Sequence, residues 1–194
     1  MTDNCNYEMK LLKEIKMDVI QNFNIPEKRL DDKWNKVFGK NEIIGEGWIG
    51  IGLKTDLYED EKWIGKNDEE GEWYLAYYVP KELRSSENRE IKAFLGNIIT
   101  DGFKIGPLQL LKNYSDLNNP GNKVGVGIYF STDIHLARSY SQIININGIY
   151  YYSIIMARVK PDAIRYAKCD LPYWVLNPST DEIRPYRILF KKAD

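Results

Sequence analysis

Two tyrosines eleven residues apart, Tyr129 and Tyr140, stand in the setting best suited to holding a ligand. Tyr129 belongs to the run Gly125-Val126-Gly127-Ile128-Tyr129-Phe130-Ser131, whose glycines let the backbone come close to a ligand or to a neighbouring strand. Polar residues after this run can cap a helix over residues 134–142, with Tyr140 near its last turn. The two phenol rings could then face one cleft. The alternative is a strand-turn-helix corner packed on its own aromatic rings.

The single histidine, His135, argues against most hydrolytic mechanisms. Serine-histidine and cysteine-histidine relays would all depend on this one imidazole, and a zinc site with several histidine ligands cannot be built. We expect His135 to be a surface residue of the helix after Tyr129. Cys5 and Cys169 are too few for a disulfide framework and lack the spacing of a metal site. We therefore expect an intracellular protein, cytoplasmic or nuclear, without a metal.

Length and charge favour one domain without a broad surface for a polyanion. The chain has 194 residues, enough to bury a substantial core without staples. Its formal net charge is -1, with acidic and basic residues interspersed, so the sequence predicts no broad contact with nucleic acid or an anionic membrane. No apolar run reaches membrane-spanning length, and the N-terminus lacks the features of a signal peptide. We expect no membrane partner and no secretion.

Helical spacing of apolar residues appears mainly in the first half of the chain. The pattern predicts an amphipathic helix over about residues 7–21, ended by Pro26, and a second helix over about 27–38. A third helix is predicted over about 87–99, before a turn at Gly102. We expect residues 1–42 to form an N-terminal helical segment that packs on the core.

Runs rich in aromatic and β-branched residues dominate the second half. These runs predict several strands besides the one at Tyr129. We expect the segment 144–149, between the helix that holds His135 and the strand that begins near Tyr150, to be a turn. The predicted strands cover about 73–79, 150–159, 173–176 and 183–191, with a glycine-dense strand or loop at 45–52. Helices and strands do not alternate regularly, which favours an α+β fold with a mainly antiparallel sheet over residues 43–194.

From about Trp48 to the C-terminus, these segments resemble, in the same order, the ADP-ribosyltransferase fold of the poly(ADP-ribose) polymerase-like branch. The run from Gly125 matches best. The resemblance implies that Tyr129 is the family's second motif residue and that Tyr140 is the ring that stacks on nicotinamide. The helix and turn over 98–106 resemble the segment that precedes this run in many members. NAD is the substrate or ligand that the resemblance implies.

The first strand of the resemblance departs from the family at two positions. Trp73, Ala76 and Tyr77 match the approach to the family's histidine-glycine pair, but Tyr78 stands in place of the histidine and Val79 in place of the glycine. A phenol could partly imitate the hydrogen bond from histidine to a ribose hydroxyl, whereas the branched valine narrows the approach to the backbone. The resemblance implies these ligand-binding positions: Tyr78, Val79, Gly127, Tyr129, Ala137 and Tyr140.

Two further departures concern binding and catalysis. Ala137 occupies the place of a serine that hydrogen-bonds the carboxamide, and Pro172 aligns with the family's catalytic glutamate. In the family a carboxylate stabilises the cation-like transition state of ADP-ribosyl transfer, and a proline supplies neither charge nor a donor. Nearby carboxylates, including that of Asp181, could replace the glutamate. The catalytic candidates are Tyr129, Asp170 and Glu182.

Two other groups of side chains allow more than one interpretation. Arg184, next to Asp181 and Glu182, could pair with a carboxylate or a phosphate, and the alternative is a turn with a surface ion pair. Tyr58 and Trp63 lie in an acidic stretch that we expect to be solvated, although both rings could fold back onto the domain.

Three functions follow from these observations. The first is an ADP-ribosyltransferase-like domain with impaired catalysis, which acts by binding an NAD- or ADP-ribose-like ligand or a protein partner. The second is an active NAD-dependent ADP-ribosyltransferase that uses a relocated carboxylate. The third is an α+β interaction protein without nucleotide affinity, in which the Tyr129 region is packed core.

Overall fold

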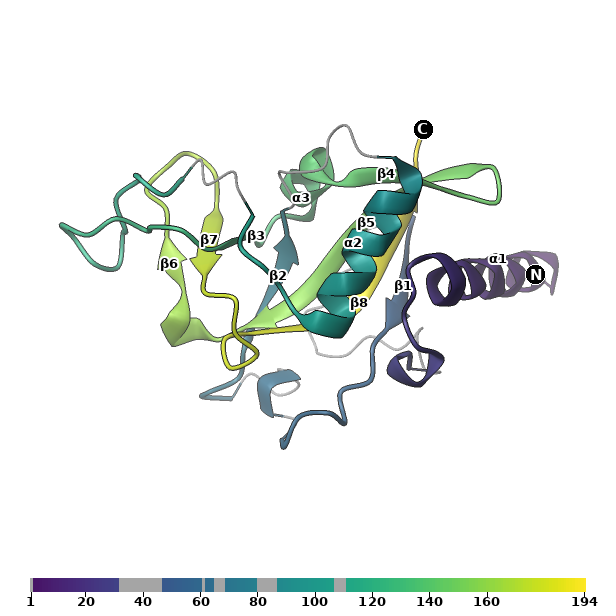
Figure 1. The fold of residues 1–194 in the computed structure, drawn as a ribbon, viewed down its shortest axis with the longest axis horizontal. Coiled ribbons are helices and arrows are strands. Elements are labelled where there is room, and N and C mark those ends of the chain that lie inside the picture. Colours follow the sequence, from purple (N-terminus) through teal and green to yellow (C-terminus); the bar gives the residue numbers. More distant parts are fainter. Residues whose placement is uncertain (1, 32–46, 61, 65–68, 80–86, 107–110) are drawn as a thin grey trace.

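The computed structural model describes residues 2–31, 47–60, 62–64, 69–79, 87–106 and 111–194. These residues form an α+β fold with three α-helices and one eight-stranded sheet (Figure 1). The α-helices are α1 (Thr2–Asn22), α2 (Asn88–Asp101) and α3 (Ile134–Tyr140), and the 3-10 helices are η1 (Glu27–Arg29), η2 (Lys62–Ile64) and η3 (Pro161–Ala163). The strands are β1 (Trp48–Gly52), β2 (Tyr74–Tyr78), β3 (Ile128–Ser131), β4 (Gln142–Ile146), β5 (Ile149–Val159), β6 (Arg165–Tyr166), β7 (Tyr173–Leu176) and β8 (Ile183–Lys192).

The sheet is built around its two longest strands, β5 and β8. The strand order is β1-β8-β5-β2-β3-β7-β6, and β4 pairs with β5 outside this path. All pairings between these strands are antiparallel, which confirms the expected class of fold. β8 has a bulge at Tyr186: Met156 of β5 pairs with Arg187 and the next residue, Ala157, pairs with Pro185, so the register skips Tyr186. A bulge disrupts the hydrogen-bond ladder locally and so tolerates the proline.

Side chains are buried on both faces of the sheet. On one face, α1 and α2 pack on residues such as Ile155 and Ile188, and Figure 1 shows α2 crossing in front of β5 and β8 with α1 beside it. On the other face, α3 and the segment around Trp63 pack on residues such as Tyr129 and Ile154. Burial on both faces explains why the central strands are almost continuously apolar in sequence rather than alternating.

α2 has sequence signals at both of its ends. It begins with a capping box, in which the Glu87 side chain accepts from the backbone of Glu90 and the Glu90 carboxylate accepts from Glu87 N at 3.3 Å. It ends at Gly102, whose φ of +89° favours glycine. Within the helix, Gly96 allows close packing on the end of α1, since a Cβ there would lie 1.7 Å from the carbonyl oxygen of Phe23.

The segment 144–149 is not a turn as predicted. Its first residues belong to β4, which forms a hairpin with β5. Only Asn147 and Gly148 turn the chain, with φ of +51° and +84°. Asn-Gly favours the tight hairpin turns that require two positive φ angles, and this signal was present in the sequence.

The structure also differs from the predicted helix over 27–38 in the part of this segment that it describes. Its first residues form only the 3-10 helix η1, after which Leu30 makes a bridge with Leu53 next to β1. The remainder falls in 32–46, outside the described residues, as does the expected boundary between the segments 1–42 and 43–194.

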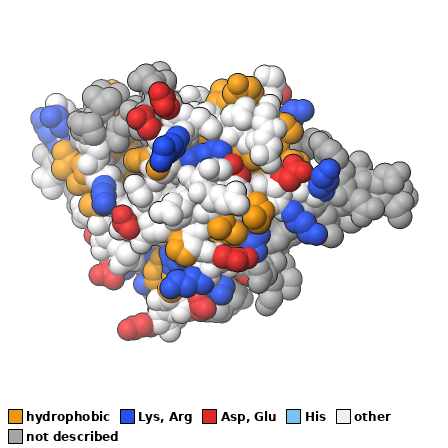
Figure 2. Space-filling view, turned by 45° about the vertical axis from the view of Figure 1, so that its right-hand side comes forward, with side chains coloured by type: hydrophobic (Ala, Val, Ile, Leu, Met, Phe, Trp, Pro, Cys, Tyr) orange, Lys and Arg blue, Asp and Glu red, His pale blue; other side chains and the backbone are white. Residues whose placement is uncertain are grey.

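The described surface is mixed in charge. On the face drawn in Figure 2, acidic and basic side chains are interspersed, as expected from the sequence. Among the described residues, no helix combines the length and hydropathy needed to cross a membrane.

A buried ion pair joins α1 to α2. Lys92 Nζ lies 2.7 Å from Asp18 Oδ2 and 2.9 Å from Asp18 Oδ1, and the two side chains are 5% and 8% exposed. Asn22 Nδ2 donates to Asp18 at 2.6 Å. Lys92 Nζ also lies 5.9 Å from the centre of the Phe23 ring. Charges removed from water require such partners, so this contact links the N-terminal helix specifically to α2.

We predict that Lys92→Met lowers the free energy of unfolding by about 3–5 kcal/mol, because it leaves the Asp18 carboxylate buried without its cation. The double variant Asp18→Leu/Lys92→Met should recover much of this loss, since it removes both charges. Chemical denaturation of the three proteins measures the effect. Equal stability of the single variant and the unchanged protein would show that the pair is not buried in solution.

Candidate functional site

Tyr129 and Tyr140 lie on the same side of the sheet. Tyr129 is at the second position of β3, and its ring belongs to the core under α3. Tyr140 is the last residue of α3 and packs against the same core, half-buried. The helix starts as expected, since Asp133 caps it by accepting a hydrogen bond from His135 N at 2.8 Å, and the His135 residue is exposed. The structure therefore places both rings that the sequence singled out against one core.

The polar groups around Tyr129 bond to the protein itself. Tyr129 is 4% exposed, and its hydroxyl accepts a hydrogen bond from Leu111 N at 3.1 Å. The backbone N–H of Val79 donates to Tyr129 O at 3.0 Å. The Val79 side chain is buried in the same core, as is Ala137. A carboxamide that approached Val79 would have to compete with this hydrogen bond of the sheet.

Tyr78 faces away from Tyr129. It pairs with Phe130 in the β2–β3 register, and its ring packs beneath α2, 5.1 Å from the Phe103 ring and 6.5 Å from the Phe94 ring between centres. Side chains alternate along a strand, so Tyr77 is the residue of this pair that shares a core with Tyr129.

The two glycines before Tyr129 are accounted for by packing. Gly125 has a φ of +68°, which favours glycine. A Cβ on Gly127 would lie 2.5 Å from the carbonyl oxygen of Leu176 and 2.7 Å from Arg165 Nη2. The Arg165 guanidinium donates to the carbonyl oxygens of Val124 and Val126 on either side of Gly125. Close contact with β7 and Arg165 is thus a sufficient reason for glycine at these positions, without a ligand.

The loop before β3 is held by Asp116. Its carboxylate accepts from the backbone N–H groups of Asn118 at 3.0 Å and Tyr166 at 3.2 Å, and from the Asn119 side chain at 2.8 Å. Burial acts to raise the pKa of Asp116, but these hydrogen bonds and the charge of Arg165 outweigh it and lower the pKa below its usual value. The ionised carboxylate therefore fixes the loop that carries Leu111 to the Tyr129 hydroxyl.

Tyr173 lies beside Tyr140 at the start of β7. The ring centres are 6.4 Å apart in an edge-to-face arrangement, and Tyr173 is buried. Burial raises the pKa of the Tyr173 phenol, and the neighbouring Tyr140 and Cys169 raise it further. The Tyr173 phenol is therefore uncharged near neutral pH, and it supplies no negative charge to stabilise a cation.

The candidate carboxylates lie outside this aromatic core. Asp170 is exposed in the segment before β7, as is Pro172. Glu182 belongs to the turn between β7 and β8, where its carboxylate accepts from Asn177 N at 3.0 Å and from Asn177 Nδ2 at 3.2 Å. Asp181 is exposed, and its N–H donates to Ser179 Oγ at 3.1 Å. Glu182 therefore stabilises a turn in this structure.

Arg184 lies among aromatic rings. Its guanidinium carbon is 4.5 Å from the ring centres of Tyr58 and Trp73 and 5.3 Å from that of Trp63, and Nε donates to Thr180 O at 3.1 Å. These contacts are cation-π interactions. The acidic stretch therefore folds back through Tyr58 and Trp63, the alternative that the sequence left open, and Trp63 is fully buried.

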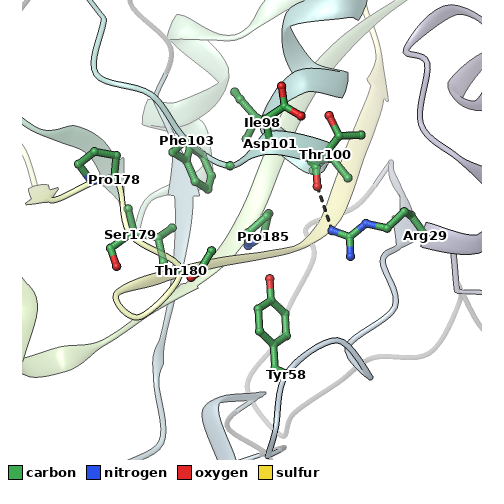
Figure 3. Close-up of a pocket in the computed structure, with 13 residues that line it drawn as sticks. Arg29, Tyr58, Ile98, Thr100, Asp101, Phe103, Pro178, Ser179, Thr180 and Pro185 are labelled. Carbon is green, nitrogen blue, oxygen red and sulfur yellow. Dashed lines mark hydrogen bonds between the residues drawn. The ribbon is translucent and has the colours of Figure 1, made fainter.

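A second region of interest is a cavity of about 180 Å³ at the C-terminal end of α2 (Figure 3). Arg29, Tyr58, the end of α2 and the turn between β7 and β8 line it. Arg29 Nη2 donates to the carbonyl oxygen of Ile99 at 2.9 Å. No sequence pattern marks Arg29 as a site residue, because η1 comes next to α2 only in the tertiary structure.

The described residues contain no group of three or more histidine, cysteine, aspartate or glutamate side chains placed to hold a metal ion. No protein-family model matches the chain, and no curated protein matches it significantly.

We predict that Gly127→Ala lowers the free energy of unfolding by about 1–3 kcal/mol, because the new methyl group would overlap the β7 backbone. Val126→Ala, at the exposed neighbouring position, is the control and should change stability by no more than about 0.5 kcal/mol. Thermal or chemical unfolding measures both. Equal stability of the two variants would mean that β3 and β7 do not approach this closely.

The raised pKa of Tyr173 predicts a loss of stability at alkaline pH. The folded protein holds this proton more tightly than the unfolded chain, so stability is fully present below the ordinary tyrosine pKa of 10.0 and falls as pH rises above it. Tyr173→Phe should make the free energy of unfolding fall less steeply with pH in the range on the order of one unit either side of 10.0, from about pH 9 to about pH 11. Tyr150→Phe, at an exposed tyrosine, controls for removal of a phenol. The idea fails if both variants decline alike.

Proposed function

We propose that this chain is an ADP-ribosyltransferase-like domain that binds an NAD- or ADP-ribose-like ligand without transferring ADP-ribose. The observation that carries the proposal is the order of three neighbouring strands. β2, β3 and β7 contain the three segments that resemble the family's motif strands, and they are hydrogen-bonded side by side. Tyr129 on β3 and Tyr140 on α3 lie on the same side of these strands.

The contacts of the carboxylates support the absence of transfer. Cleavage of the nicotinamide-ribose bond develops positive charge, which a carboxylate must meet at close range. Pro172 and Asp170 are both exposed in the segment before β7, whereas Glu182 is bonded to Asn177 in the next turn. Tyr173, which begins β7, is an uncharged phenol. Active transfer would therefore require Glu182 to give up its hydrogen bonds to Asn177, or the exposed Asp170 to meet the developing charge.

The half-buried ring of Tyr140 is the proposed contact for the ligand. Tyr129 is too enclosed to offer a ring face, and its hydroxyl is bonded to Leu111 N. Tyr140 ends α3 and keeps part of its surface in solvent. A flat heteroaromatic ring could stack there, with a gain typical of aromatic pairs.

Close packing around Tyr129 also favours a second candidate, an α+β interaction protein without nucleotide affinity. Tyr77, Val79, Tyr129 and Ala137 are all buried in one core. The second candidate requires this kind of core, which is filled by its own side chains and needs no ligand. Measurement of NAD binding separates the two.

We predict that calorimetric titration with NAD gives saturable binding, that Tyr140→Ala weakens it about tenfold through loss of stacking, and that no nicotinamide is released. Tyr150→Ala, which removes an exposed tyrosine from β5, should leave the affinity unchanged. Chromatography of the same mixtures detects nicotinamide. Its release would establish the active transferase instead, and absence of binding heat at several temperatures would favour the interaction protein.

A further inference from the structure

The cavity at the C-terminal end of α2 brings together segments from four parts of the chain. Arg29 follows α1, Tyr58 comes from the segment after β1, residues 98–103 end α2, and residues 178–180 turn between β7 and β8. Its volume of about 180 Å³ is smaller than the ~300–1,000 Å³ of pockets that hold drug-sized ligands. A ring with one substituent would fit such a space, but a dinucleotide would not.

Two hydrogen-bond donors point into this space. In Figure 3 the Tyr58 hydroxyl and the Arg29 guanidinium approach it from different segments. Arg29 is oriented by its bond to Ile99 O, which uses one of the five N–H donors of a guanidinium. Burial raises the pKa of Tyr58, and the nearby charges of Arg29 and Arg184 offset this only in part. The phenol therefore keeps its proton near neutral pH and can donate it.

The balance of charge at the cavity favours an anion. Two arginines, Arg29 and Arg184, act on the Tyr58 hydroxyl. Among the described residues that line the cavity, only Asp101 is acidic. Its carboxylate points away from the space between Arg29 and Tyr58 in Figure 3 and lies 3.8 Å from Lys104 Nζ. The carbonyl groups that end α2 carry partial negative charge, and Arg29 offsets part of it by its bond to the carbonyl oxygen of Ile99.

Part of the remaining wall is apolar. Phe103 and Ile98 face the cavity from the end of α2 and the residues after it, and Pro178 and Pro185 line it from the turn before β8 and from β8 (Figure 3). Ile183 of β8 is a further apolar lining residue. These side chains would shield a hydrocarbon group from water. An inorganic ion would leave them without a partner.

We propose that this cavity binds a small organic oxyanion, with the carboxylate or phosphate held by Arg29 and Tyr58 and the apolar body against Phe103 and the prolines. A guanidinium and a phenol together form charge-assisted hydrogen bonds to such a group. The site shares no residue with the Tyr129–Tyr140 region, so it stands independently of NAD binding.

The test is an NMR titration of the full chain with benzoate, phenyl phosphate and benzyl alcohol. The two anions should shift the backbone amide signals of Gly102, Ser179 and Thr180 saturably, and benzyl alcohol, the neutral probe, should bind at least about tenfold more weakly. The better of the two anions identifies the oxyanion. Equal binding of benzyl alcohol, or no saturable shift at these amides with either anion, would overturn the proposal.

Matched variants separate the site from general charge. Tyr58→Phe keeps the ring that stacks with Arg184 and removes only the hydroxyl, and it should weaken binding about tenfold. Arg29→Met should weaken it at least as much, whereas Lys28→Met, an equal change of charge at the exposed neighbour, should alter it less than about twofold. Because Arg29 also bonds to Ile99, the amide spectrum of each variant is checked for folding. Unchanged affinity in folded Tyr58→Phe would rule out the proposed contact.

Discussion

The antiparallel pairing of β5 with β8 is the constraint on which the other elements depend. These strands are the longest in the sheet, and they connect β1 and β4 to β2, β3, β7 and β6. From Ser153 to Val159, β5 is buried at every position, so each of its faces must be covered. α1 and α2 cover one face, while α3 and the segment around Trp63 cover the other. Large apolar area removed from water on both sides stabilises this arrangement.

Coverage of both faces determines where a ligand can bind. Tyr129, the most suggestive residue in sequence, lies within the covered part of the sheet, and its polar groups bond to neighbouring backbone. The two surfaces that we propose for ligands lie where covering elements end. Tyr140 lies at the last residue of α3, and the cavity of Arg29 and Tyr58 lies at the end of α2. Both proposed binding regions are thus consequences of helix termination, where packing is incomplete and polar groups need partners.

Local signals predicted most elements, and the errors have local causes as well. α2 and α3 have capping residues in the sequence, and β2, β5, β7 and β8 are apolar runs that end at polar residues, proline or glycine. The predicted turn over 144–149 wrongly includes the end of the short strand β4, although Asn147-Gly148 is itself a hairpin signal. β6 consists of two residues held by β7, so no pattern of its own could reveal it. The cavity could not be predicted, since Arg29 and Tyr58 lie on segments that meet only after folding.

The sequence by itself determined the class of fold, the long central strands and the position of Tyr129 before a capped helix, because these depend on residues close together in the chain. Only the tertiary structure decided which way side chains face. The bulge at Tyr186 reverses the alternation along β8, so that Ile183 and Ile188 enter the same core although strict alternation would separate them. Register between β2 and β3 likewise directs Tyr78 beneath α2 and Tyr77 toward Tyr129. The direction in which a side chain points depends on the pairing of strands that are distant in sequence. That pairing is determined by the burial of the whole sheet rather than by any single run of residues.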